Sequence, residues 1–216
     1  MRDDDPQSLF PLYAILDADV AGGAGWALTD LATACLAGGA RLLQIRAKQA
    51  SSAWLLDVAS AITEQARTAG ATVIVNDRAD VARMANAGGV HVGQDDLPPA
   101  LARVILGDAA TVGLSTHTRE QIESAVAQPI SYLAVGPVFE TSTKATGYTA
   151  IGLDGVRAAV ERSRGRGLPV VAIGGITLET AADVIRAGAA SVAVISDLLS
   201  GGNPERRVRT YIQRLS

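Results

Sequence analysis

The chain has 216 residues, a formal net charge of −3, 48% hydrophobic residues, 22 glycines and only 4% aromatic residues. This length suits one domain with a sizeable core, and the slight negative charge excludes a general electrostatic attraction to nucleic acid or to an anionic membrane surface. We therefore expect small-molecule partners, and any anionic ligand must be met by positive charge supplied locally.

The first ten residues are acidic and lack the apolar stretch of a secretory signal peptide. We expect residues 1–10 to form a flexible tail on a single domain that spans residues 1–216. No apolar run is long enough to cross a bilayer, and Cys35, the only cysteine, excludes an internal disulfide. These features predict a soluble cytoplasmic protein in which Cys35 is a buried structural thiol.

Short apolar runs suited to buried strands alternate with segments of helical periodicity. The expected strands are residues 12–16, 42–45, 73–75, 90–92, 111–114, 132–135, 170–173 and 191–195. The expected helices are residues 26–37, 53–68, 79–87, 98–106, 119–127, 153–162, 178–187 and 204–215. Eight alternating pairs predict an α/β fold, a single (β/α)8 TIM barrel with eight parallel strands, and an open doubly wound sheet is the alternative.

Alanine followed by glycine marks the ends of several expected helices. We expect left-handed C-caps at these junctions, because glycine adopts a positive φ without steric cost. The junctions are Ala37-Gly38-Gly39, Ala69-Gly70, Ala87-Gly88-Gly89 and Ala187-Gly188.

Basic residues follow the second expected strand. Gln44, Arg46 and Lys48 alternate along the chain, so their side chains are expected on one face of the strand. An arginine and a lysine that face the barrel interior cannot be buried unpaired. We therefore expect them to reach the barrel mouth, where a guanidinium and an ammonium suit phosphate or diphosphate oxygens. A network of salt bridges at the rim is the alternative.

Acidic residues follow the next two strands. Asn76-Asp77 ends one strand, and Asp95-Asp96 lies beyond the other. Two carboxylates beside a phosphate-binding cluster indicate Mg²⁺, which bridges carboxylate and phosphate oxygens. The spacing does not separate Asp95 from Asp96. The alternative is that the carboxylates pair with nearby cations, namely Arg46, Arg78 or Lys48.

A second group of phosphate-binding candidates lies in the carboxyl-terminal half. The longest irregular segment, residues 136–152, contains hydroxyl groups and one lysine in the run Thr141-Ser142-Thr143-Lys144. The last two strands end at Gly174-Gly175 and at Ser196, where parallel barrels usually bind phosphate. A structural tight turn at the glycines is the alternative. Two phosphate regions across one mouth predict two phosphorylated substrates, or one substrate with two phosphates.

The two histidines do not compel a catalytic role. We expect His91, in mid-strand, to be a hydrogen-bonded core residue. For His117 the sequence does not decide between a catalytic and a structural role. Trp26, Trp54 and Tyr132 are expected to be packing residues. The sequence contains no Ser-His-Asp order, HExxH motif or Cys/His metal pattern, which argues against acyl transfer and zinc hydrolysis.

Together these residues closely resemble the thiamine phosphate synthase family over residues 13–196. The motifs that carry the resemblance are Gln44-x-Arg46-x-Lys48, Val75-Asn76-Asp77-Arg78, His91-Val92-Gly93-Gln94-x-Asp96, Gly113-x-Ser115-x-His117, Gly136-Pro137-Val138-Phe139-x-Thr141-x-Thr143-Lys144 and Ala172-Ile173-Gly174-Gly175-Ile176. The resemblance implies coupling of 4-amino-2-methyl-5-(diphosphooxymethyl)pyrimidine with a thiazole phosphate to form thiamine phosphate. Pyrophosphate would leave by a magnesium-assisted dissociative step, and a carboxylated thiazole would also lose carbon dioxide.

By position in these motifs, the resemblance implies three sets of site residues. The pyrimidine diphosphate would be bound by Gln44, Ile45, Arg46, Ala47, Lys48, Asn76, Ser115 and Lys144, of which Arg46, Lys48, Ser115 and Lys144 would take part in catalysis. One Mg²⁺ per active site would be bound by Asp77 and Asp96, which favours Asp96 over Asp95. The thiazole phosphate would be bound by Thr141, Ser142, Thr143, Gly175, Ile195 and Ser196.

Three residues depart from the family pattern, namely Gly89, Glu140 and Asp197. Glu140 and Asp197 would add negative charge near anionic ligands, so we expect both to point outward. The rival functions are the related thiazole tautomerase, another phosphate-binding isomerase barrel and a non-catalytic binding barrel. The complete set of basic and acidic positions argues against the tautomerase and the binding barrel, and the lack of a clear base argues against the isomerase. The sequence is compatible with a homo-oligomer but does not determine the oligomeric state.

Overall fold

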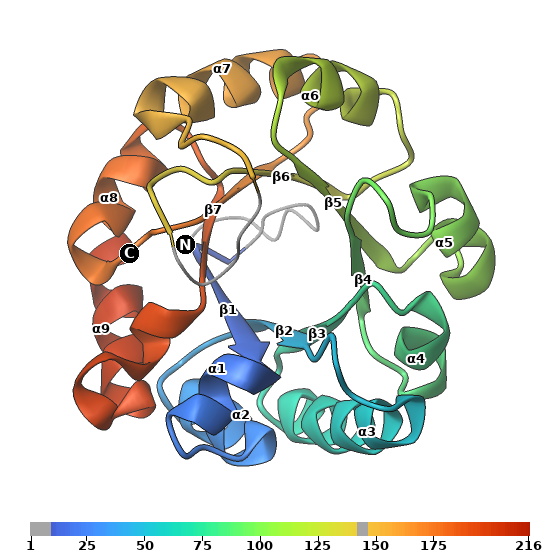
Figure 1. Ribbon diagram of the computed structural model, residues 1–216, viewed down its shortest axis with the longest axis vertical. Coiled ribbons are helices and arrows are strands. Elements are labelled where there is room, and N and C mark those ends of the chain that lie inside the picture. The colour runs from blue at the N-terminus through green and yellow to red at the C-terminus, as the bar shows by residue number, and fades with distance from the viewer. Residues whose placement is uncertain (1–9, 142–146) are drawn as a thin grey trace.

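Eight parallel strands close into a barrel, in which β1 pairs with both β2 and β8 (Figure 1). The computed structural model describes residues 10–141 and 147–216. The strands are β1 (Leu12–Asp17), β2 (Leu42–Arg46), β3 (Thr72–Asn76), β4 (Gly89–Val92), β5 (Thr111–Thr116), β6 (Tyr132–Val135), β7 (Val170–Ile173) and β8 (Ser191–Val194). The predicted (β/α)8 barrel is confirmed, and the alternative of an open sheet is wrong.

Helices surround the barrel and cover the outer face of its strands (Figure 1). They are α1 (Ala18–Gly23), α2 (Leu28–Ala37), α3 (Ser52–Thr68), α4 (Ala79–Met84), α5 (Pro99–Leu106), α6 (Arg119–Val126), α7 (Gly152–Arg164), α8 (Leu178–Arg186), the 3₁₀ helix η1 (Ser196–Gly202) and α9 (Pro204–Leu215). All eight expected helices are present, with ends that differ by a few residues. Helices α1 and η1 were not predicted, because each is short and ends in two glycines, a composition typical of a loop.

The apolar core has an outer and an inner part. The outer part lies between strands and helices, and it includes small residues such as Ala32, Ala59 and Ala181, which let the helices approach the sheet closely. The inner part fills the barrel and includes Tyr13, Ile15, Leu42, Ile74, Tyr132, Ala134, Val171 and Ala193. Alternate residues of each strand therefore face inward, so strand-end residues of the same parity project into the barrel mouth.

Three of the four helix–strand junctions have the expected left-handed glycine: Gly39 (φ 104°), Gly70 (φ 65°) and Gly188 (φ 107°). The junction at residues 87–89 differs, because Asn86 takes the positive φ of 50°. Gly89 is needed there for a different reason: a Cβ on it would lie 1.8 Å from the carbonyl oxygen of Thr111 on the next strand. Close packing of β4 against β5 therefore explains why this chain has glycine at position 89, where it departs from the family pattern.

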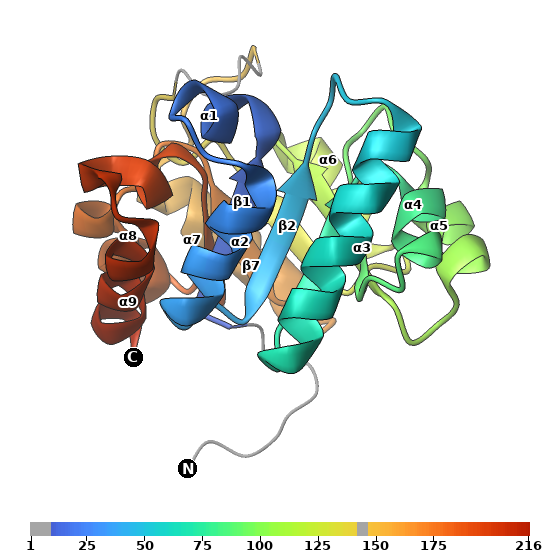
Figure 2. The same ribbon diagram turned by 90° about the horizontal axis from the view of Figure 1, so that it is seen from below.

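The arrowhead of β2 points to one rim of the barrel (Figure 2), and β1 runs parallel to β2, so both strands end at that rim. Of the expected tail, residues 1–9 lie outside the described residues. Among the residues that are described, no helix is long and apolar enough to cross a membrane.

Candidate active site

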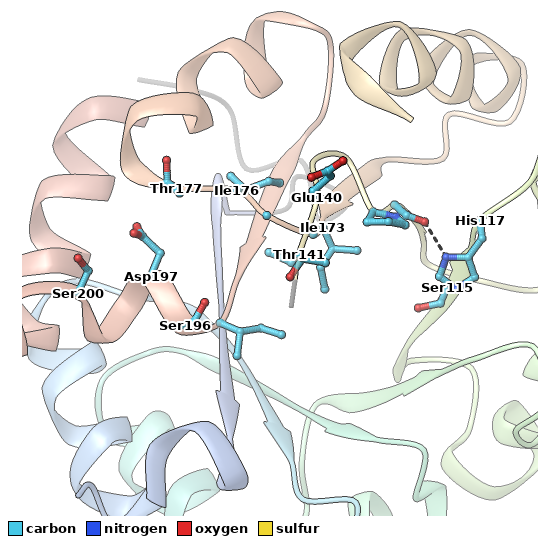
Figure 3. Close-up of a pocket in the computed structure, with 16 residues that line it drawn as sticks. Ser115, His117, Glu140, Thr141, Ile173, Ile176, Thr177, Ser196, Asp197 and Ser200 are labelled. Atoms are coloured by element: carbon cyan, nitrogen blue, oxygen red, sulfur yellow. Dashed lines mark hydrogen bonds between the residues drawn. The ribbon is translucent and has the colours of Figure 1, made fainter. Parts of the chain in front are cut away.

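Two adjoining cavities open at the carboxyl ends of the strands. The larger, of about 400 Å³, is lined mainly by residues that follow β6, β7 and β8, and we call it the β7–β8 cavity (Figure 3). The smaller, of about 290 Å³, lies over β2, β3 and β4 and is called the β2–β4 cavity. The two share a wall formed by Ser115, His117, Ile173, Ala193 and Ile195. Ligands in the two cavities would therefore meet at this wall.

The β2–β4 cavity contains the predicted cations, and each is paired with a carboxylate. Arg46 forms an ion pair with Asp17, whose side chain is only 2% exposed. Lys48 Nζ lies 3.0 Å from Asp77 Oδ2. Strand β2 ends at Arg46, so Lys48 reaches the cavity from the following turn and does not continue the strand face as expected.

Asp17, which forms an ion pair with the cavity residue Arg46, was not identified from the sequence. It ends β1, and its Oδ1 also accepts the backbone N–H groups of Asp19 and Val20 at 3.1 and 3.0 Å, which caps α1. The sequence did contain a pattern that points to Asp17. It is a polar residue at the end of the first strand, and polar residues in this position identified candidate site residues on the other strands. Its buried charge requires a partner, and Arg46 supplies it.

Two carboxyl groups approach each other in the same cavity. Burial and the hydrogen-bonded Asp96 carboxyl raise the pKa of Asp77, against the opposing effect of Lys48. Asp96 Oδ2 accepts the backbone N–H of Gly93 at 2.7 Å, which holds Asp96 toward the cavity. Asp95 lines the cavity as an exposed residue. Asp77 thus has both the acidic neighbour expected of a cation site and the lysine partner of the alternative interpretation.

The remaining residues assigned to the pyrimidine diphosphate divide into two groups. Gln44, Asn76 and Ser115 line the β2–β4 cavity. Ile45 and Ala47 line neither cavity, because their side chains pack on the outer face of the barrel. The described residues contain no cluster of three or more His, Cys, Asp or Glu side chains suited to a metal ion.

Of the residues assigned to the thiazole phosphate, Thr141, Gly175, Ile195 and Ser196 line the β7–β8 cavity (Figure 3). Gly175 has a φ of 64°, and a Cβ on it would lie 2.5 Å from the carbonyl oxygen of Glu140. Only glycine fits this turn, which leaves its backbone open to a ligand. Ser142, Thr143 and Lys144 lie outside the described residues.

Asp197 lines the β7–β8 cavity, so the expectation that it points outward is wrong. Its carboxylate accepts hydrogen bonds from Arg207 Nη2 at 2.8 Å, from the backbone N–H of Leu178 at 3.1 Å and from the Tyr211 hydroxyl. Arg207 neutralises the charge that would otherwise repel a phosphate. Glu140 also lines this cavity, as an exposed residue.

His117 lies on the shared wall and is fixed by its neighbours. Its Nδ1 donates to the carbonyl oxygen of Gly136 at 2.6 Å (Figure 3). Its ring stacks on Tyr148, with centroids 4.3 Å apart and planes 13° apart. Tyr148 lines the β2–β4 cavity and was not identified from the sequence. This stack joins the segment after β6 to the rim of β5.

His91 is a hydrogen-bonded core residue, as predicted. Its Nδ1 lies 2.8 Å from the Tyr132 hydroxyl, and its Nε2 lies 2.8 Å from Ser115 Oγ. Tyr132 also contacts the Tyr13 hydroxyl, at 3.0 Å, so it is more than the packing residue that was expected. Burial raises the pKa of both tyrosines, which keeps them protonated.

Cys35 and Arg78 lie away from the cavities, and the expectation of a buried structural thiol at Cys35 is confirmed. Cys35 is fully buried among apolar residues, and burial raises the pKa of its thiol to about 12. Arg78 precedes α4 and bonds to Asp80 and Ser52, outside the site.

Comparisons with known proteins agree with one another. The family model described as "Thiamine monophosphate synthase" (TMP-TENI) matches residues 12–198. Thiamine-phosphate synthase of Koribacter versatilis is 45% identical over 206 residues, which is 94% of this chain and 95% of that protein. Thiamine-phosphate synthase of Chloroflexus aurantiacus is 42% identical over 189 residues, 88% of this chain and 85% of that protein. A solved thiamine phosphate pyrophosphorylase from Pyrococcus furiosus superposes with a TM-score of 0.87 at 28% identity and covers 98% of both chains.

Proposed function

The chain belongs to the thiamine monophosphate synthase family, whose members are transferases of thiamine biosynthesis, and from this premise we propose how its two cavities divide the reaction. The β2–β4 cavity binds 4-amino-2-methyl-5-(diphosphooxymethyl)pyrimidine, and the β7–β8 cavity binds the thiazole phosphate. The products are thiamine phosphate and pyrophosphate, with carbon dioxide as a third product when the thiazole is carboxylated. The shared wall supports this division, since both cavities reach Ser115 and Ile195.

The charge balance of the β2–β4 cavity is the observation that carries the magnesium assignment. Among the described lining residues, the lysine and arginine cations are Arg46, which pairs with Asp17, and Lys48, which pairs with Asp77. Asp95 and Asp96 also line the cavity, so a diphosphate meets no excess of positive charge from these six residues. A divalent cation removes the deficit, and Asp77, whose pKa is raised by burial and by the adjacent Asp96 carboxyl, forms with Asp96 the type of carboxylate pair that Mg²⁺ prefers. Asp77 and Asp96 would hold this ion.

Bound there, Mg²⁺ would neutralise charge on the diphosphate oxygens. Arg46 and Lys48 bind the same oxygens and stabilise the charge that grows on the leaving group, and Lys144, outside the described residues, is assigned to this task by its motif. The aminopyrimidine ring releases electron density to its methylene carbon. The carbon–oxygen bond therefore breaks without a nucleophile, and the thiazole nitrogen then attacks the resulting cation.

The protein's share of this chemistry is positioning and electrostatics. Thr141 and the backbone at Gly175 and Ser196 hold the thiazole phosphate at the far side of the β7–β8 cavity. The thiazole nitrogen then lies at the shared wall, facing the methylene carbon. The buried free thiol of Cys35 and the phosphorylated substrates favour a cytoplasmic site of action.

The test is to incubate the purified chain with both substrates and Mg²⁺, and to measure thiamine phosphate by mass spectrometry and pyrophosphate by a coupled assay. We expect both products in equal amounts, none when either substrate is omitted, and loss of turnover with EDTA that Mg²⁺ restores. Absence of thiamine phosphate under these conditions would reject the proposed reaction. Full activity after exhaustive metal removal would reject the magnesium site alone.

A further inference from the structure

A continuous chain of hydrogen bonds crosses the inside of the barrel from β2 to β5. Gln44 Nε2 donates to the Tyr13 hydroxyl at 2.9 Å, and the Tyr13 and Tyr132 hydroxyls lie 3.0 Å apart. The Tyr132 hydroxyl lies 2.8 Å from His91 Nδ1, and His91 Nε2 lies 2.8 Å from Ser115 Oγ. We call these five residues the interior chain. Both of its ends, Gln44 and Ser115, line the β2–β4 cavity.

The donor at Gln44 sets the direction of the interior chain. Tyr13 accepts from Gln44 and is 1% exposed, so its own proton is best satisfied by donation to Tyr132. Tyr132 is 0% exposed and accepts from Tyr13, so its proton is donated to His91 Nδ1. An imidazole that accepts at Nδ1 carries its hydrogen on Nε2, and His91 therefore donates to Ser115.

We propose that the interior chain fixes Ser115 as a hydrogen-bond donor toward the bound pyrimidine diphosphate, with Tyr132 and His91 as positioning residues. Ser115 Oγ accepts from His91, so its own proton is left for the cavity. An acceptor atom of the ligand, such as a ring nitrogen or a diphosphate oxygen, would receive it. The identity of this ligand rests on the proposed function, whereas the direction of the hydrogen bonds does not.

Packing holds the rings of the interior chain in place. A Cβ on Gly113 would lie 2.0 Å from a ring carbon of Tyr132, so glycine at this position makes room for the tyrosine inside the barrel. The His91 ring stacks on Tyr132 with planes 15° apart, and Tyr13 meets Tyr132 edge-on at 87°. The hydroxyl groups are therefore presented along one fixed path, as a positioning device requires.

The opposite direction makes a different prediction for His91. If the chain ran from Ser115 to Gln44, His91 would carry its hydrogen on Nδ1, and Ser115 would offer a lone pair to the ligand. The tautomer of His91 distinguishes the two directions without any substrate. His117, the only other histidine, is an internal reference, because it donates from Nδ1 to Gly136.

The first experiment is ¹⁵N NMR of the imidazole groups of the full chain, with signals assigned from a His117→Gln variant. We expect His91 as the Nε2–H tautomer and His117 as the Nδ1–H tautomer. Tyr132→Phe removes the partner of Nδ1 and is expected to bring the Nδ1–H form of His91 to a measurable fraction. Tyr13→Phe is the matched control and should leave the tautomer unchanged, because the Tyr132 hydroxyl still donates to His91. A wild-type His91 in the Nδ1–H form would overturn the proposal, as would an unchanged tautomer in Tyr132→Phe.

The second experiment is a double-mutant cycle on kcat/KM for the pyrimidine diphosphate. Tyr132→Phe and Ser115→Ala are each expected to lower kcat/KM by roughly three- to tenfold, the range for one net hydrogen bond. The double variant should be no worse than Ser115→Ala, because Tyr132 acts through the serine hydroxyl. Losses that multiply would overturn the proposal, since they would show a general packing role for Tyr132. If the wild-type chain formed no thiamine phosphate, the proposed function would fail, and the tautomer measurement would still decide the direction of the chain.

Discussion

The buried ion pair between Asp17 and Arg46 yields the sharpest stability prediction. The Asp17 side chain is 2% exposed and that of Arg46 is 16% exposed, so neither charge is well hydrated in the folded protein. Asp17→Asn keeps the shape and the oxygen that caps α1, but it removes the charge and turns an amide toward the guanidinium. Loss of one partner from a buried pair costs about 3–5 kcal/mol, and the partial exposure of Arg46 places the expected loss near 3 kcal/mol.

The assay is urea unfolding of wild type and variant, with the free energy of unfolding extrapolated to water. The matched control is Asp80→Asn, which breaks the Arg78–Asp80 pair, where the side chains are 39% and 54% exposed. That pair is expected to contribute under about 1 kcal/mol. If Asp17→Asn lowers stability no more than Asp80→Asn does, burial of the pair does not matter and the reasoning is wrong.

Binding adds a second readout for the same variant. In Asp17→Asn the Arg46 guanidinium lacks its carboxylate, and an oxyanion in the β2–β4 cavity can replace it. Saturating magnesium pyrophosphate should therefore raise the Tm of Asp17→Asn by more than it raises the Tm of wild type. An equal rise in both proteins would show that Arg46 does not reach the bound anion.

Three further predictions concern single substitutions or reactivity. Lys48→Ala should lower the free energy of unfolding by under about 1 kcal/mol, because the side chains of Lys48 and Asp77 are 40% and 23% exposed. Steady-state assays of the same variant should show a large loss of turnover, and unchanged turnover would show that Lys48 is not a site residue. Gly113→Ala should prevent normal folding, since its Cβ would overlap the Tyr132 ring, and circular dichroism with an unaltered Tm would contradict this steric argument. The Cys35 thiol, with a pKa of about 12, should resist iodoacetamide at pH 8 in the native protein and react with it in urea. Mass spectrometry measures the alkylation, and rapid alkylation without urea would show that the thiol is accessible.

The sequence alone determined the fold and the rim on which the chemistry lies. Strand and helix periods are local properties, so eight alternating apolar runs sufficed to predict the barrel. Polar residues at the ends of parallel strands lie at one rim, which explains why Gln44 and Asn76 were expected at the same barrel mouth. The choice of Asp96 over Asp95 came from the family resemblance, and both residues line the cavity. The short elements α1 and η1 were missed because each ends in two glycines, which are typical of a loop.

Only the tertiary structure decided which partner each polar group has. Asp17 meets Arg46 because β1 and β2 are paired in register, and Asp197 meets Arg207 because α9 packs beside η1. The interior chain joins residues as far apart in sequence as Tyr13 and Tyr132, which the closure of the barrel brings within 3.0 Å. Hydrogen bonds and ion pairs depend on distances of a few ångströms across the fold, and a sequence pattern carries no such distances.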